Sequence, residues 1–184
     1  MRPTPSLFLT LVISLFLYLS CSEEQDFDQF DDLEITPAVA SSIFSFEADE
    51  DFINTVTTVN TFYTQTFIFE AFSEQFVAER LLEGTITYEF ANTTSKPLNI
   101  IVEFLDAGDN VLDFENFNIA QGPNQTLTRN VEYGPNGKPL DILINTASIR
   151  VTGRNLGDNV SVSPEPDAKV TMKSAAEFIF QLVE

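Results

Sequence analysis

The chain has 184 residues, of which 28 are acidic and nine are Lys or Arg, and it contains no histidine. A formal net charge of −19 repels polyanions, which argues against nucleic acids and unaided binding to anionic lipid headgroups as partners. The lack of histidine excludes Ser-His-Asp and Cys-His catalysis and His-ligated zinc. Apolar residues make up 43% of the chain, which is enough to bury a hydrophobic core and argues against global disorder. The length of the chain predicts a single folded domain.

The first twenty residues have the layout of a secretion signal. Arg2 precedes an apolar run at residues 7–19, and the small Ser20 follows the run. A membrane-spanning helix needs about 20 apolar residues, so this run is too short for a permanent anchor. We therefore expect residues 1–20 to be a signal peptide, whose removal takes Arg2 away and leaves a net charge of −20.

The only cysteine of the chain follows this signal directly. The sequence Leu-Tyr-Leu-Ser-Cys that ends at Cys21 resembles the bacterial lipobox, in which a small residue precedes a cysteine that is acylated before cleavage. Tyr18 stands where that motif usually has Leu. The resemblance implies that Cys21 carries the lipid that holds the protein on a membrane. The alternative is ordinary cleavage that leaves a free Cys21; in either case no intrachain disulfide can form.

An acidic stretch comes next. Its beginning resembles the surface-export signal of Bacteroidota lipoproteins, through Ser22, Glu23, Glu24 and Asp26. The resemblance implies a flavobacterial-type lipoprotein in the outer membrane, exposed on the cell surface. The other interpretation is a solvated tether that self-repulsion keeps extended and that carries no information on the leaflet. In both cases residues 21–34 are expected to be an acidic tether and residues 35–184 a single domain.

In the first part of that domain the sequence predicts three strands and a helix. Residues 67–72 are expected to form a strand, and residues 73–83 have helical spacing of their apolar side chains. The clearest strand is 85–92, where apolar and polar residues alternate strictly. The polar run 92–97 is typical of a turn, so we expect a hairpin between 85–92 and a strand at 98–104.

Further strands follow at regular intervals. We expect a turn in which Gly108 adopts positive φ, and then a strand over 111–119 with a bulge near Glu115 or Asn116. The remaining expected elements are a strand at 126–133, one helical turn at 139–145, a strand at 148–153 and a last strand at 170–183, kinked near 174–176. Roughly seven to nine short strands with frequent turns indicate an antiparallel β-sandwich of immunoglobulin-like type, with one or two short helices.

One stretch of these strands is similar to a known class of small accessory domain. It runs from Phe90-Ala91-Asn92 through Pro97-Leu98 to Phe104-Leu105-Asp106. This order of strand, Asn/Pro turn, strand and Leu-Asp resembles WHy-type and related accessory sandwiches. The resemblance implies a fold and no activity.

No residue pattern in the chain predicts catalysis. The chain lacks a glycine-rich phosphate loop, so we expect no enzyme, no cofactor and no dedicated metal site. The leading interpretation is a non-catalytic accessory or protein-interaction domain of the cell envelope, anchored to the membrane through its N-terminal lipid, with an envelope protein as partner. The alternative is a carbohydrate- or calcium-dependent binding module, because turns rich in Asp and Asn supply the oxygen ligands that calcium prefers.

Overall fold

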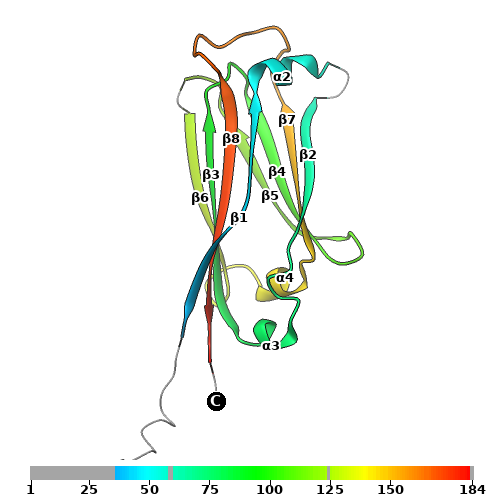
Figure 1. Ribbon diagram of the computed structural model, residues 1–184, viewed down its shortest axis with the longest axis vertical. Coiled ribbons are helices and arrows are strands. Elements are labelled where there is room, and N and C mark those ends of the chain that lie inside the picture. The colour runs from blue at the N-terminus through cyan, green and yellow to red at the C-terminus, as the bar shows by residue number, and fades with distance from the viewer. Residues whose placement is uncertain (1–35, 58–59, 124, 183–184) are drawn as a thin grey trace, which may run out of the picture. The chain divides into compact units, whose positions relative to one another are not determined.

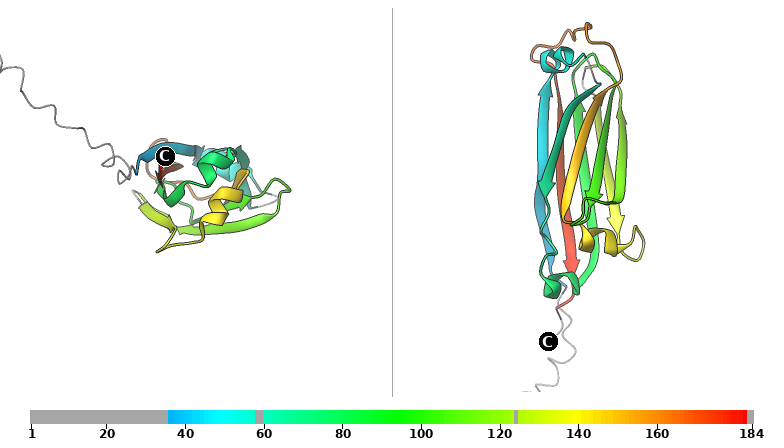
Figure 2. Two further views of the ribbon diagram at one scale, coloured as in Figure 1. Left: turned by 90° about the horizontal axis from the view of Figure 1, so that it is seen from below. Right: turned by 90° about the vertical axis from the view of Figure 1, so that its right-hand side faces the viewer.

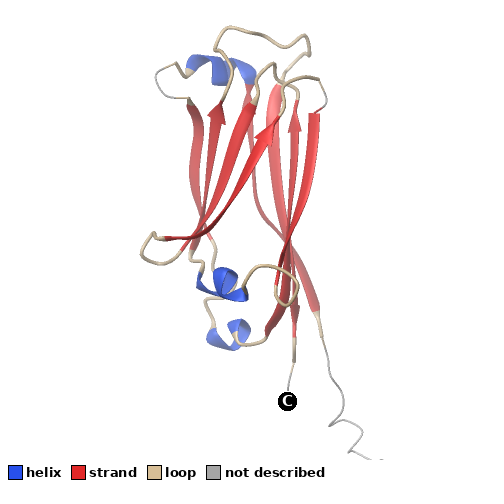
Figure 3. Ribbon diagram, turned by 180° about the vertical axis from the view of Figure 1, so that it is seen from behind, coloured by secondary structure: helices blue, strands red, loops and turns tan. Residues whose placement is uncertain are grey.

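The computed structural model describes residues 36–57, 60–123 and 125–182. All of its elements belong to one compact unit, Glu34–Glu184, and eight strands dominate it (Figures 1 and 3). The first sheet has the strand order β1-β8-β3-β6, formed by β1 (Ala38–Asp49), β8 (Lys169–Phe180), β3 (Leu81–Asn92) and β6 (Gln125–Tyr133). The second sheet has the order β2-β7-β4-β5, formed by β2 (Thr61–Ile68), β7 (Ser148–Asn155), β4 (Leu98–Leu105) and β5 (Val111–Ile119). Three short helices connect the strands: α2 (Glu50–Thr55), α3 (Gln75–Ala78) and α4 (Leu140–Asn145).

The strand pairing is that of one long hairpin rolled on itself. The pairs β1·β8, β2·β7, β3·β6 and β4·β5 are all antiparallel, and β3·β8 and β4·β7 join them into the two sheets. An eight-stranded sandwich wound in this way is a jelly roll. The predicted antiparallel sandwich is confirmed, whereas its strand order differs from the immunoglobulin-like order, in which the first and second strands are neighbours.

The inner faces of the two sheets pack together around one core, and the view from below in Figure 2 shows the sandwich end-on. In β3 the strict alternation predicted from the sequence places Ile86, Tyr88 and Phe90 in the core. Strand β4 lies at the centre of the second sheet, and Ile100, Val102 and others of its side chains are fully buried. Phenylalanines supply much of the aromatic packing between the sheets, in a chain that has no Trp.

The two seams between the sheets differ in chemistry. Along the seam between β1 and β2, aromatic rings stack across the sheets: Phe44 lies on Phe67 with ring centroids 5.1 Å apart, and Phe46 lies on Tyr63 at 4.2 Å. Along the seam between β5 and β6, charged side chains meet instead. The sandwich therefore has one aromatic seam and one ionic seam.

Local patterns misplace several connections. The expected hairpin between 85–92 and 98–104 is wrong, because β3 and β4 lie in different sheets. The expected helix over 73–83 is mostly wrong: α3 covers only Gln75–Ala78, and β3 begins at Leu81, whose side chain is buried in the core. The hairpin is wrong because the partner of a strand is not a local property, and the helix ends early because Leu81 pairs with Phe180 in the first sheet.

Two turn details also differ from expectation. Strands β4 and β5 shift register between Phe104 and Leu105, not near Glu115 or Asn116. The apolar phase of β5 changes because Phe114 faces solvent, while Glu115 takes an inward position. In the preceding turn the positive φ belongs to Asp109, at 61°.

The strand expected at 67–72 lies earlier in the chain. Strand β2 is Thr61–Ile68, and Phe69 and Phe72 beyond its end are buried in the core instead. The helical turn expected at 139–145 is confirmed by α4. At the kink expected near 174–176, β8 keeps a regular register with β3, and the irregularity lies in the neighbouring strand β1, between Ser42 and Phe44.

The turn after β6 gives a test of this packing. A Cβ on Gly137 would collide with the backbone carbonyl of Glu132, which accepts a hydrogen bond from Lys138 at 2.8 Å. A backbone carbonyl cannot rotate away from the new methyl group as the end of a side chain can. We therefore expect Gly137→Ala to lower the free energy of unfolding by about 1 to 3 kcal/mol. Urea denaturation of the mature chain measures this loss.

Gly108→Ala is the matched control, since a Cβ there meets only the side-chain ends of Asn110 and Asp106. We expect it to cost less than about 1 kcal/mol. Equal losses in the two variants would contradict the close approach at Gly137.

Candidate functional site

The loops at one end of the sandwich form the best candidate site. The chain enters β1 at one end of the first sheet, and α2 lies at the other end, beside the connection from β7 to β8 (Figure 1). We call the α2 end the set of α2, the β3–β4 turn at 93–97 and the β7–β8 connection at 156–168. These segments are far apart in the sequence, and buried charged groups join them.

Glu50, the first residue of α2, is one of those buried groups. Its carboxylate accepts hydrogen bonds from the backbone N–H and the hydroxyl of Ser95, both at 2.6 Å, and from the backbone N–H of Ser163 at 2.7 Å. Burial raises the pKa of Glu50, but these hydrogen bonds, together with the charge of Lys96, outweigh burial and lower it. One carboxylate therefore fixes α2 to both loops.

Lys96 is the second buried charged group, with only 1% of its side chain exposed. Its ammonium group donates to Asp158 Oδ1 at 3.0 Å and to the backbone oxygen of Ser161 at 2.8 Å. Asp158 also accepts bonds from the N–H groups of Val160 and Ser161 and from the Ser161 hydroxyl. Hydrogen bonds from Ser161, Val160 and Lys96 hold the pKa of Asp158 well below its usual value, so the loop is organised around an ionised carboxylate.

Amide side chains complete this frame. Asn155, at the end of β7, donates to the backbone oxygen of Asp158 and to Asn159 Oδ1, both at 2.9 Å. Asn54 of α2 donates to the backbone oxygen of Ser161 at 3.2 Å. The conformation of the connection at 156–163 is thus fixed from several sides by polar contacts.

On this frame, apolar side chains face solvent. Val160 is 81% exposed and Val162 is 69% exposed, and Leu156 and the α2 residue Phe52 are more than half exposed. Single exposed apolar residues are common on protein surfaces, but several on one pair of packed segments are typical of a contact surface. The α2 end therefore presents apolar side chains on a loop whose backbone is already ordered.

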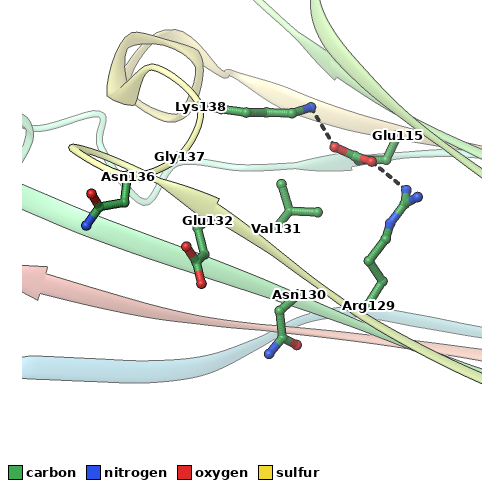
Figure 4. A pocket seen from close by; sticks show the side chains of 8 residues that line it. All are labelled: Glu115, Arg129, Asn130, Val131, Glu132, Asn136, Gly137 and Lys138. Carbon is green, nitrogen blue, oxygen red and sulfur yellow. Dashed lines mark hydrogen bonds and ion pairs between the residues drawn. The ribbon is translucent and has the colours of Figure 1, made fainter.

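The ionic seam is the second place where functional side chains gather (Figure 4). Glu115 of β5 accepts bonds from Arg129 of β6 and from Lys138, both at 2.5 Å, and Lys138 also reaches Asp113 at 2.5 Å. The guanidinium of Arg129 lies 3.8 Å from the ring centroid of Phe117, a cation–π contact. An open depression of about 430 Å³ lies beside these residues.

The charges of this seam satisfy one another. Burial lowers the pKa of Lys138, but its bonds to Asp113 and Glu115 outweigh burial and raise it. Beneath the seam, burial and the nearby carboxylates raise the pKa of Tyr133 and Tyr88, which keeps both phenols neutral. The ion pairs of this seam therefore link the edge strand of one sheet, β6, to the edge strand of the other, β5.

The site residues predicted from the sequence are not among those that the structure describes. Cys21, Ser22, Glu23, Glu24 and Asp26 all fall outside the described residues. Within residues 36–57, 60–123 and 125–182, no group of three or more His, Cys, Asp or Glu side chains is placed to hold a metal ion.

Two further findings bear on the sequence predictions. No helix within the described residues is both long and apolar enough to span a membrane. Tyr88 and Tyr133 are buried in the core, and Tyr63 is stacked on Phe46. The rings of Tyr88 and Tyr133 are therefore not displayed as platforms for a sugar.

Sequence reasoning missed Lys96 and Glu50. Both were part of stretches whose charges are typical of solvated turns. The signal that distinguishes Lys96 is its neighbourhood: it stands between hydroxyl residues and Pro97, just before a strongly apolar strand, in a chain with very few basic residues.

Comparison with known proteins identifies no family to which this chain belongs. No protein-family model and no curated protein matches this sequence. Among solved structures, the infectious bursal disease virus VP2 subviral particle is similar with a TM-score of 0.41 and 10% identity over 82% of this chain, which spans 33% of the viral chain.

Two further similar structures have comparable scores. The Triatoma virus empty capsid has a TM-score of 0.37 and 12% identity, covering 78% of this chain and 89% of its own. The enzymatically active domain of bacteriophage CBA120 tailspike protein 4 has a TM-score of 0.33 and 14% identity, covering 84% of this chain and 20% of its own. This chain spans about a third of VP2 and a fifth of the tailspike chain, and the identity of neither protein is carried over to it.

The buried carboxylate of Glu50 gives a pH-dependent test. Its folded pKa lies below 4.5, so its contribution to stability is present above about pH 4.5 and is lost as the pH falls through the folded value. We expect Glu50→Gln to lower the free energy of unfolding by about 1 to 3 kcal/mol at neutral pH. The deficit should shrink as the pH is lowered from neutral to below 4.5. Denaturant titrations across that range measure it.

Glu47→Gln is the control, because Glu47 makes only a surface ion pair with Lys169 at 3.2 Å. Its effect should be small at every pH. A Glu50→Gln deficit that does not change with pH would contradict the role of the ionised carboxylate.

Proposed function

We propose that this protein is a lipid-anchored, surface-exposed lipoprotein whose jelly-roll domain is a non-catalytic accessory or protein-interaction domain of the cell envelope. In this proposal Cys21 carries the lipid, Ser22, Glu23, Glu24 and Asp26 direct export to the cell surface, and the α2 end contacts a partner protein. We expect the contacting surface of the partner to be apolar, because exposed valine side chains gain most when they are removed from water against apolar groups.

The observation that carries the proposal is the exposure of Val160 and Val162 on an ordered loop. A mobile loop would lose conformational entropy on binding, and that loss weakens an interface. Here Lys96, Glu50 and Asp158 have already fixed the backbone in the free domain. Apolar contact area on such a loop is gained with little further ordering.

The direction of the chain supports the same face. Residues 22–35 lead into β1, which begins at the end of the sheet opposite α2 (Figure 1). A lipid on Cys21 would therefore attach through the far end of the domain and leave the α2 end free for a partner. The acidic composition of the tether repels it from anionic headgroups, which also keeps the domain away from the membrane.

The proposal predicts a loss of partner contact when the loop is made acidic. Cells that express the full chain with Val160→Glu and Val162→Glu together are treated with a membrane-impermeant crosslinker. We expect the wild-type chain to give a discrete crosslinked product, and the double variant to give about tenfold less, because buried carboxylates at an interface lose their hydration. The mature N-terminal peptide from the same cells should carry acyl chains on Cys21 by mass spectrometry.

Leu112→Glu is the matched control, since Leu112 is an exposed apolar residue of β5 away from the α2 end. Its product should equal that of the wild type. Equal crosslinking by the double variant would contradict the assigned face. An unmodified N-terminal peptide, or a chain that the crosslinker reaches only after lysis, would contradict the lipoprotein proposal.

A further inference from the structure

The two strands of the aromatic seam, β1 and β2, carry few charges. No charged residue lies between Glu34 and Glu47, and none lies between Asp51 and Glu70, in a chain with 28 acidic residues. These two stretches contain nearly all of β1 and all of β2, which are the edge strands of the two sheets on one side of the sandwich. Charged side chains are one of the devices that keep edge strands of monomeric proteins from pairing with other chains.

The free edge of β1 can be assigned residue by residue. The N–H of Phe180 donates to the backbone oxygen of Pro37 at 3.1 Å, so Pro37 faces β8. Backbone groups alternate sides along an antiparallel strand, so those of Val39 and Ser41 also face β8. The N–H and C=O groups of Ala38 and Ala40 therefore point to the opposite, open side.

Nothing in the described part of the chain covers that side. The segment Ala38–Ser42 is exposed at every residue, and among the described strands β8 alone pairs with it. The inner face is open as well: Val39 is 51% exposed, although it stands opposite Phe178, which is buried against Phe72 at a centroid distance of 5.0 Å. A side chain placed beside Val39 would extend this aromatic cluster.

We propose that the edge of β1 at Ala38–Ser42 is a strand-addition site, which takes an extended, non-acidic segment of a partner polypeptide as a fifth strand of the first sheet. The backbone groups of Ala38 and Ala40 supply the hydrogen bonds, and Val39 supplies an apolar contact on the inner face. The bulge between Ser42 and Phe44 interrupts the regular ladder and limits the site to a short segment.

The charge of the chain selects the occupant. A net charge of −19 repels a second copy of the chain and any acidic segment. A neutral or basic segment is not repelled, because Ala38–Ser42 carries no charge. Two identical edge strands also pair antiparallel across a two-fold axis, which puts the beginnings of the two chains at opposite ends of the pair. That second argument rests on the proposed function, because two copies anchored on one membrane begin on the same side.

The test uses the mature, unlipidated chain and a labelled peptide of about ten residues that alternates Thr and Val between terminal Lys residues. We expect fluorescence anisotropy to show saturable binding to the wild type. Ala40→Pro should weaken it at least about tenfold, because proline removes the N–H on the open edge and leaves the bonds to β8 intact. Ala40→Val, which keeps the N–H, should bind as the wild type does.

Changes in the peptide keep the test independent of how well the variant folds. The same peptide N-methylated at alternate residues, offered to the wild-type chain, should not bind, and a version with terminal Glu residues should bind at least about fivefold more weakly. Absence of binding by the unmodified peptide, or equal binding by Ala40→Pro, would overturn the strand-addition site.

Sedimentation of the chain alone tests the other occupant. We expect a monomer at all concentrations. A concentration-dependent dimer that Ala40→Pro abolishes would assign the edge to a second copy and overturn the choice of partner. Because the lipid is absent from these measurements, their failure is separate from failure of the lipoprotein proposal.

Discussion

The pairing of the last strand with the first is the interaction on which the rest of the domain depends. Strand β8 lies between β1 and β3, so it holds together a sheet whose members come from the beginning, the first half and the end of the chain. Without β8, neither Phe44 nor Phe46 of β1 has a sheet from which to reach the core. Contacts between such distant segments close long loops, which makes folding of all-β domains slow and cooperative.

The rolled hairpin leaves two seams, and their difference organises the surface chemistry. At the β5–β6 seam, Glu115 joins the two sheets through Arg129 and Lys138, so the free edges there are held by charge. At the β1–β2 seam, aromatic stacking joins the two sheets, and the backbone edge of β1 stays open. A partner strand can be accommodated only where no charged side chain has to lose its hydration. The α2 end offers a different kind of contact, through side chains on an ordered loop.

The sequence was sufficient for most strands and insufficient for their partners. The alternation of Ile86, Tyr88 and Phe90 predicts β3 because one face of the strand is buried, and that is a local property. The partner of a strand is not local: β3 precedes β4 by a short turn, yet pairs with β6 and β8. Long-range pairing is set by how the whole chain packs, which no window of residues contains.

The candidate sites show the same limit. Lys96 looks like a turn residue in the sequence, and only the fold brings Asp158 and Ser161 around its ammonium group. The open edge of β1 is likewise invisible without the register, although the absence of charge between Glu34 and Glu47 is plain in the sequence. Cys21 and the acidic residues after it stay a prediction from motif resemblance, because they lie outside the described residues.

The central claim is that β1 is satisfied by β8 on one edge and open on the other. Residue-resolved amide hydrogen exchange on the mature chain tests it most directly, because bonded amides exchange slowly and open ones do not. The register predicts slow exchange at Val39 and Ser41 and fast exchange at Ala38 and Ala40. Uniform protection of all four amides, or uniform fast exchange, would contradict an edge strand held in this way.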